Sequence, residues 1–347
     1  MTDPAAIPVV EPQDLSLWRE RALRLETEVG RVVIGQERVI RFLLIALLAH
    51  GHVLLEGDVG VGKTTLLRAM ARGVGGPYQR VEGTVDLMPT DLIYHASIGD
   101  DGRPRLEPGA LLRHGETLAV FFFNEINRAR PQVHALLLRL MAERSLTAFN
   151  REFSLPYVVI FADRNSLERD ETFDLPAAAR DRFFFEVNVS MPTDPEARRQ
   201  LIFDRRFHDT DTLVAEIGEG LLDYRALPAL ARLIQAEVTT SPALEEYVLS
   251  LWSALRDPVA AGIALPDIDM SRLVKGGASP RGMAYLVRAA HVRAWLEGRK
   301  TVMPEDVRAV FIESVAHRIF VDPIYLLRRE AIVRDLCTAI LEKVRAP

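Results

Sequence analysis

Cysteine and histidine are scarce in this sequence. The 347 residues contain one cysteine, Cys337, which cannot form a disulfide within the chain and lies in a helix-like run that favours a small buried side chain over a nucleophile. Of the eight histidines, His50 and His52 alone lie close together, and no acidic or cysteine residue stands directly beside them. We therefore expect neither a disulfide scaffold nor a metal site built from histidines.

Long apolar runs and surplus positive charge are also missing. The longest apolar run, Phe42 to Ala49, is far too short to cross a bilayer, and the acidic start of the chain lacks the basic and apolar parts of a signal peptide. These features favour a cytoplasmic protein without a membrane partner. The formal net charge of -5 and the pI of ≈ 6.0 give no general attraction to nucleic acid, which leaves only a local basic patch for such binding.

The length allows two domains, each with its own core. Strand-like and helix-like runs alternate up to Met191–Pro195, and helix-like runs dominate after it. Polar, turn-rich stretches between the apolar runs predict two hairpins, at 93–108 and 145–156. We therefore predict a flexible arm over residues 1–15, an α/β core over 16–192 and a helical domain over 193–347.

One glycine-rich stretch, Gly57 to Thr65, fits the pattern G-x-x-x-x-G-K-[ST]. It follows a strand-like run, His52 to Glu56, and leads into an amphipathic helix-like run. In that context the loop's N–H groups bind phosphate oxygens, Lys63 reaches the β and γ phosphates, and the Thr64 hydroxyl binds Mg²⁺. A turn without a ligand is the alternative, and the flanking strand and helix argue against it. The predicted nucleotide-binding residues here are Gly60, Val61, Gly62, Lys63, Thr64 and Thr65.

A second candidate for nucleotide contact precedes this loop. Val33, Ile34 and Gly35 form the end of an apolar segment that we expect to be extended, before a helix-like run. Apolar side chains can stack on an adenine while the backbone reads its edge. An ordinary turn that packs on the core explains these residues equally well.

A continuous apolar run, Leu118 to Phe123, predicts a buried strand that ends in Asn124 and Glu125. P-loop ATPases place a pair of carboxylates at such a strand end, the first to hold Mg²⁺ and the second to orient the attacking water or accept its proton. Glu125 can act on water in this way. Asn124 is the candidate metal ligand, although its neutral amide lacks the charge of a carboxylate.

The next predicted strand, Tyr157 to Ala162, leads to Asp163, Arg164 and Asn165. Ligands of open α/β sheets bind at the carboxyl ends of the strands. Asn165 is therefore placed to hydrogen-bond the γ-phosphate or the attacking water. Capping of a turn is the alternative role.

Two arginines at the boundaries of predicted elements are further candidates for a catalytic role. Arg182 precedes the apolar run Phe183 to Val187 and is either a surface charge or an arginine finger for a neighbouring subunit, which contributes roughly 10³ to 10⁵ in rate in other phosphoryl-transfer enzymes. Arg281 follows Ser279 and Pro280, which suit the N-cap and first position of a helix. The helix dipole disfavours a cation there, so Arg281 either has a phosphate partner or is simply solvated.

Taken in order, these motifs resemble the MoxR family of AAA+ ATPases over about Val32 to His317. The resemblance implies an αβα core with a five-stranded parallel sheet, two insertion hairpins and a C-terminal all-α lid. It also implies ATP and Mg²⁺ as cofactors. The stretches that carry it are VIGQ, GDVGVGKTT, EPGALL, NEINRARPQ, MAERSLT, ADRNSLE, LPAAARDRF and GASPRG.

The resemblance also implies roles for single residues. Lys63 and Thr64 match the Walker A positions, and Glu125 matches the hydrolytic glutamate. Asn165 matches sensor 1, Arg182 matches the arginine finger and Arg281 matches sensor 2. With Glu125, these three residues are the catalytic candidates. Family members are generally hexameric rings that remodel protein clients, commonly with a partner that carries a von Willebrand factor A domain.

The chain departs from the family pattern at two places. Asn124 stands where the family usually has Asp, and Arg164-Asn165-Ser166 stands where Gln-Asn-Pro is usual. The first departure predicts weaker Mg²⁺ binding. We therefore consider three functions: an ATP-hydrolysing remodelling motor, an ATP-bound switch or scaffold with slow hydrolysis, and a helicase-like or chelatase-like motor.

Overall fold

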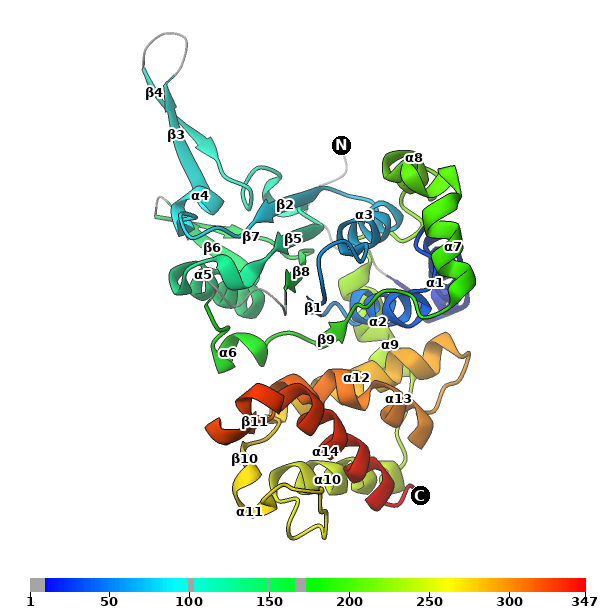
Figure 1. Cartoon of the computed structure of the whole chain (residues 1–347). Helices are drawn as coiled ribbons and strands as arrows, with labels where there is room; N and C mark the ends of the chain where they lie inside the picture. The colour runs from blue at the N-terminus through cyan, green and yellow to red at the C-terminus, as the bar shows by residue number, and fades with distance from the viewer. Residues whose placement is uncertain (1–9, 99–102, 149, 166–172) are drawn as a thin grey trace.

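The computed structural model describes residues 10–98, 103–148, 150–165 and 173–347, and Figure 1 shows their arrangement. The predicted arm lies largely outside this part of the chain. Its described end forms a short 3-10 helix, Pro12–Asp14, and the first α-helix begins at Leu15. Within the described part, no helix is both long and apolar enough to cross a membrane.

A five-stranded parallel sheet forms the centre of the core, as predicted. Its strand order is β2-β5-β8-β1-β9, and every neighbouring pair is parallel. Because parallel strands end at the same edge, the residues that follow them meet there. The strands are β1 (Val53–Glu56), β2 (Tyr78–Glu82), β5 (Val120–Asn124), β8 (Val159–Arg164) and β9 (Phe185–Asn188).

Helices cover both faces of this sheet and make three layers (Figure 1). Successive strand residues point to opposite faces, so Phe122 packs with the helices of one layer while Phe121 and Phe123 pack with those of the other. The first layer contains α1 (Leu15–Val32), α2 (Glu37–Leu48) and α3 (Lys63–Val74). The second contains α4 (Pro89–Ile93), α5 (Pro131–Glu143) and α6 (Ala177–Arg180).

The prediction of an extended segment before α2 is wrong. Helix α1 continues to Val32, and residues 33–36 make a turn into α2. The reason is the spacing of the buried residues Trp18, Ala22, Leu25, Val29 and Val32, which places Val32 on the apolar stripe of the helix.

Both predicted hairpins are confirmed. Strands β3 (Tyr94–Ile98) and β4 (Pro104–Pro108) pair antiparallel, as do β6 (Ser145–Ala148) and β7 (Arg151–Ser154). Residues 99–102, which connect β3 toward β4, lie outside the described residues. The β3–β4 hairpin stands away from the rest of the core in Figure 1.

The C-terminal part is helical, with one exception to the predicted all-α composition. Short strands β10 (Val274–Gly276) and β11 (Phe320–Val321) pair antiparallel and are too brief to give an alternating pattern in the sequence. The end of the chain forms a 3-10 helix, Pro323–Arg328, followed by α14. The helices here are α9 (Leu227–Glu237), α10 (Pro242–Arg256), α11 (Met270–Leu273), α12 (Pro280–Leu296), α13 (Pro304–Val315) and α14 (Arg329–Lys343).

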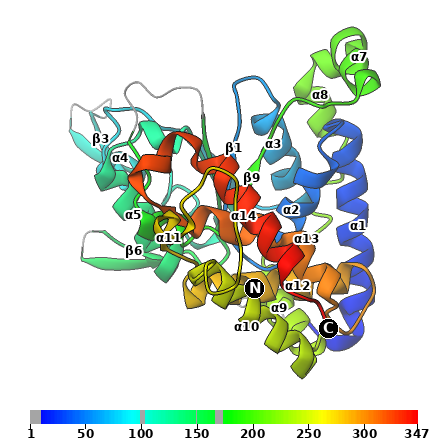
Figure 2. The same ribbon diagram turned by 60° about the horizontal axis from the view of Figure 1, so that its bottom comes forward.

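The chain does not leave the core directly after β9. Helices α7 (Pro195–Phe203) and α8 (Thr210–Ala215) lie beside α1 and α3, and the chain joins the lower group of helices at α9 (Figures 1 and 2). Helix α12 then packs on α2, and α13 packs on β9. One hydrophobic cluster continues from the core into these helices. The domain boundary at 192 therefore stays a prediction.

Candidate nucleotide-binding site

The glycine-rich loop connects the end of β1 to the first turn of α3. Gly60 has φ +81° and Gly62 has φ +89°, a left-handed conformation that glycine adopts without steric cost. Gly57 is needed for a different reason, because a Cβ atom there would lie 2.1 Å from the carbonyl oxygen of Val189. The sequence therefore folds the loop into the conformation that the motif predicts.

The loop forms one wall of an open cleft of ≈ 380 Å³ at the carboxyl edge of the sheet. The cleft brings together residues from four segments that are far apart in the sequence. Its lining residues are Val59, Gly60, Val61, Gly62, Lys63, Thr64, Thr65, Arg80, Asn124, Glu125, Asp163 and Asn165. All predicted residues of the glycine-rich loop and of the two strand ends thus line one cleft.

Lys63 is held inside this cleft by oxygen atoms. Its Nζ donates to the carbonyl oxygens of Gly57 and Asp58, the latter at 3.1 Å. It also lies 3.4 Å from Oδ2 of Asp163, and the two side chains are only 10% and 3% exposed. The ammonium group is thus largely desolvated and has a carboxylate as its partner.

Asp163 occupies the centre of this polar cluster, and sequence reasoning did not select it. Its Oδ1 accepts the backbone N–H of Glu125 at 2.6 Å. With the Asn124 amide nitrogen turned toward it, Asn124 donates to both carboxylate oxygens, at 3.1 and 3.2 Å. Burial raises the pKa of Asp163 above its ordinary value, and the Glu125 N–H and Lys63 oppose that shift. The available signal was its place directly after the predicted strand, Tyr157 to Ala162.

Glu125 has an unusual backbone at the end of β5. Its φ of 52° and ψ of 51° are left-handed, which a non-glycine residue adopts only where surrounding contacts impose it. Its side chain is 19% exposed and pairs with Arg128 at 2.9 Å. The carboxylate is therefore at the cleft but is engaged by a neighbouring cation.

A second residue that the sequence did not indicate is Arg80 of β2. It lines the cleft, and its guanidinium lies 5.7 Å from the ring centre of Phe122 on the adjacent strand. No local motif surrounds Arg80, so its position follows only from the pairing of β2 with β5. Arg80 is thus a second cation, beside Lys63, in the lining of the cleft, and it pairs with Glu82 at 3.5 Å.

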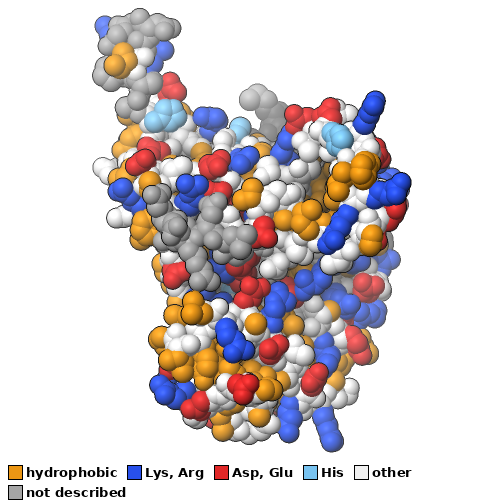
Figure 3. Space-filling view, in the orientation of Figure 1, with side chains coloured by type: hydrophobic (Ala, Val, Ile, Leu, Met, Phe, Trp, Pro, Cys, Tyr) orange, Lys and Arg blue, Asp and Glu red, His pale blue; other side chains and the backbone are white. Residues whose placement is uncertain are grey.

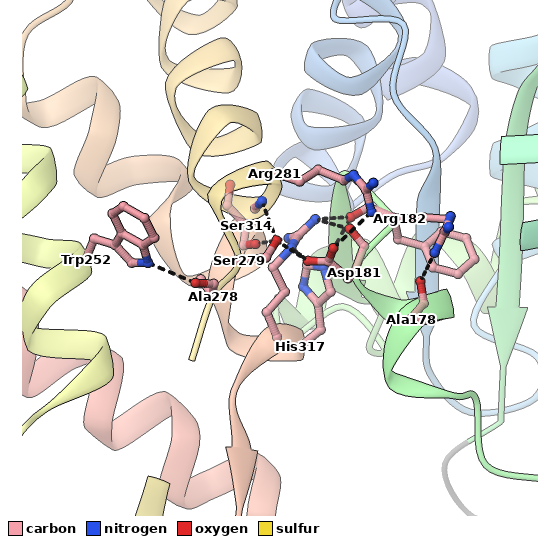
Figure 4. Close-up of polar contacts among 12 residues, drawn as sticks. Ala178, Asp181, Arg182, Trp252, Ala278, Ser279, Arg281, Ser314 and His317 are labelled. Carbon is pink, nitrogen blue, oxygen red and sulfur yellow. Dashed lines mark hydrogen bonds and ion pairs between the residues drawn. The ribbon is translucent and has the colours of Figure 1, made fainter. Parts of the chain in front are cut away.

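The structure does not bring Arg182 or Arg281 to the cleft of their own chain. Arg182 donates to the carbonyl oxygen of Ala178 at 2.8 Å, and Arg281 pairs with Asp181 at 3.2 Å (Figure 4). Asp181 also accepts from Ser279 at 2.7 Å. Both arginines therefore lie where α6 meets the C-terminal helices.

Val33, Ile34 and Gly35 also lie outside the lining of the cleft. They form the turn between α1 and α2, where a Cβ on Gly35 would lie 2.7 Å from Pro192. The next residue, Gln36, donates to the carbonyl oxygen of Ser190 at 2.7 Å. The turn thus packs against the connector, residues 189–192, whose first residue also contacts Gly57.

The oxygen donors at the cleft fit Mg²⁺ if phosphates supply the other ligands. Mg²⁺ in proteins usually keeps several waters and takes one or two carboxylates together with substrate phosphates. Thr64, Asn124 and Asp163 offer a hydroxyl, an amide and a carboxylate. Among the residues that the structure describes, no three His, Cys, Asp or Glu side chains gather as a metal site of their own.

Comparison with known proteins gives matches over both parts of the chain. Residues 52–185 match a model described as "ATPase family associated with various cellular activities (AAA)", and residues 269–336 match an AAA lid domain. The chain is 62% identical to the protein MoxR of Methylorubrum extorquens, over 97% of this chain and 99% of that protein.

Two further relatives extend this similarity. The chaperone MoxR1 of Mycobacterium tuberculosis is 36% identical, over 84% of this chain and 74% of that protein. The crystal structure of a candidate ATPase from Cytophaga hutchinsonii superposes with a TM-score of 0.81, at 26% identity, and covers 96% of this chain and 97% of that one.

Proposed function

The chain belongs to the MoxR family of AAA+ ATPases, and from this premise we propose that it is a chaperone-like motor that hydrolyses ATP at the subunit interfaces of a homo-oligomeric ring. The observation that carries the proposal is the joint placement of Lys63, Thr64, Glu125 and Asn165 around one cleft. In that cleft the N–H groups of the glycine-rich loop bind phosphate oxygens, and Lys63 exchanges its protein oxygens for those of the phosphates.

Each polar residue then has a separate task. Glu125 orients the attacking water and accepts its proton, and Asn165 hydrogen-bonds the water or the γ-phosphate. Thr64 and Asn124 line the cleft and would hold Mg²⁺, which when bound would stabilise the negative charge of the phosphate oxygens. The adenine lies against the turn of Val33, Ile34 and Gly35, because the connector joins that turn to the glycine-rich loop.

The ring proposal explains the position of the two arginines. Arg182 lies outside the cleft of its own chain and is partly exposed at the edge of the core, where it can enter a neighbour's site. Arg281 sits at the start of α12, so movement of the C-terminal helices shifts it relative to the core. A hexamer, as the family resemblance implies, is our proposed ring.

The likeness to a chaperone supports a protein client. On the face seen in Figure 3, Lys and Arg side chains are mixed with Asp and Glu, which favours a protein over nucleic acid as the client. A protein with a von Willebrand factor A domain is the proposed partner, by resemblance to the family.

A second candidate function is an ATP-bound switch or scaffold with slow hydrolysis. Two observations favour it: Asn124 is neutral, and the Glu125 carboxylate is paired with Arg128. It predicts that nucleotide stays bound after purification and that the protein assembles without multiple turnovers. Rapid multiple turnover by the unmodified protein would exclude it.

A pair of variants tests the motor. Lys63→Ala removes the phosphate-binding cation and is expected to abolish binding of a fluorescent ATP analogue. Glu125→Gln keeps the shape of the side chain but not its basicity, so it is expected to bind the analogue normally while phosphate release falls by about 10²-fold or more. Hydrolysis by Glu125→Gln at the unmodified rate would contradict the role given to Glu125.

A further inference from the structure

Asn124 lacks the negative charge of the usual Asp, and a carboxylate on the adjacent strand can replace that charge. Strands β5 and β8 run parallel with Phe123 opposite Ala162, so the next residues, Asn124 and Asp163, follow as neighbours in register. Neighbouring strands are about 4.8 Å apart, and residues in register point to the same side of the sheet. A carboxylate is therefore present beside the usual position, on the adjacent strand.

The surroundings of Asp163 show what it can bind. The carboxylate lines the cleft, is 3% exposed, and lies 3.4 Å from the Lys63 ammonium. If it acted only as a counter-ion for Lys63, it would lose its cation whenever Lys63 turned to the phosphates of a nucleotide. A buried carboxylate without a cation is strongly unfavourable, so a second cation is needed in the nucleotide complex.

We propose that Asp163 supplies the carboxylate for the Mg²⁺ of the bound nucleotide, in place of the residue at 124. The inference rests on the proposed nucleotide-binding function. Binding of the metal-loaded nucleotide then exchanges one partner of Asp163 for another: Lys63 moves to the phosphates, and the metal takes its place beside the carboxylate.

Asn124 fits this arrangement because, with its amide nitrogen turned toward Asp163, it donates to both carboxylate oxygens. A carboxylate at 124 would instead face a second carboxylate at hydrogen-bonding distance, and two such groups disfavour each other's ionisation. The single change Asn124→Asp is therefore expected to give no gain in metal affinity. The exchange of both residues, Asn124→Asp with Asp163→Asn, keeps one carboxylate and one amide.

The test measures metal affinity rather than turnover. Full-length protein is saturated with the non-hydrolysable analogue AMP-PNP, and Mn²⁺ binding is followed by the EPR signal of the free ion. Asp163→Asn is expected to lower Mn²⁺ affinity by about 10- to 100-fold. Binding of AMP-PNP in EDTA should be unchanged or tighter, because an anion has been removed from the cleft.

The double variant is the matched control, since it has the same composition of side chains as the unmodified protein. It is expected to recover Mn²⁺ affinity to within a few-fold, and it also serves if Asp163→Asn alone does not fold. Mn²⁺ affinity of Asp163→Asn within twofold of the unmodified protein would overturn the inference, as would a folded double variant without recovery. Failure of the unmodified protein to bind AMP-PNP under any condition would overturn the proposed function as well.

Discussion

At the scale of single residues, burial keeps several histidines of the core neutral. His52 is 3% exposed, and its Nδ1 accepts the backbone N–H of Ile160 at 3.0 Å. Burial, followed by the nearby charge of Arg144, holds the pKa of His52 well below its ordinary value of 6.5. His52 therefore binds a proton less readily in the folded than in the unfolded chain.

This difference predicts a pH dependence of stability. Below about pH 6.5 the unfolded state binds the extra proton, so the free energy of unfolding falls with decreasing pH by about 1.4 kcal/mol per unit for this histidine. In His52→Asn the amide oxygen can accept from Ile160, and this contribution to the slope should disappear. Urea unfolding between pH 7.5 and 5.0 measures it. Equal slopes for both proteins would contradict the prediction.

The residues of the site differ in how far sequence could predict them. Lys63, Thr64 and Glu125 belong to local motifs whose order and flanking elements already specify their place. Asp163 and Arg80 acquire their roles from strand pairing, because β8 and β2 each adjoin β5. Such a contact between strands leaves no fixed spacing along the chain, which is why the sequence did not select these two.

At the scale of elements, the start of α12 has two functions. The Ser279 hydroxyl accepts the N–H of Gly282 as an N-cap, at 3.0 Å, and donates to Asp181 of the core at 2.7 Å. Ser241 caps α10 in the same way through the N–H of Leu244, at 3.2 Å. The second serine therefore serves as a control for capping alone.

Replacement of each serine by alanine separates the two contributions. Ser241→Ala is expected to cost about 1 kcal/mol in the free energy of unfolding. Ser279→Ala should cost about 1 to 2 kcal/mol more, because it also removes a hydrogen bond to a carboxylate. Chemical denaturation of the two variants provides the comparison. Equal losses would mean that the contact with Asp181 adds nothing to stability.

Most elements could be predicted because their signals are local. Buried strands such as β5 are continuous apolar runs, and helices such as α12 carry N-cap and proline signals. The predictions of secondary structure were wrong where tertiary contacts determine the conformation. Val32 belongs to a helix stripe rather than to an extended segment, and the pair β10–β11 is held by its surroundings rather than by its own pattern.

At the scale of the whole molecule, Asp181 of the core forms hydrogen bonds and ion pairs with residues of the C-terminal part. Arg318 is 1% exposed and donates to the carboxylate of Asp181 at 3.1 Å and to its carbonyl oxygen at 3.0 Å. Burial lowers the pKa of Arg318 to about 10, so it stays charged at neutral pH. Since Arg182 follows Asp181 directly, the same contact fixes the base of the proposed arginine finger.

Mixed assemblies test whether Arg182 acts on a neighbouring subunit. Lys63→Ala and Arg182→Ala are each expected to be inactive alone. In an equal mixture, about a quarter of the interfaces of a ring join an intact glycine-rich loop to an intact Arg182, so part of the ATPase activity should return. Phosphate release across mixing ratios measures it. A mixture that stays as inactive as its components would rule out a shared site.

The connector between β9 and α7 also has a mechanical consequence. Val189 leaves no room for a side chain on Gly57, and Pro192 leaves none on Gly35. A methyl group at either glycine would therefore collide with the same connector, one at its first residue and the other at its last. Gly57→Ala and Gly35→Ala are thus expected to displace one shared segment, although the two glycines lie in different loops.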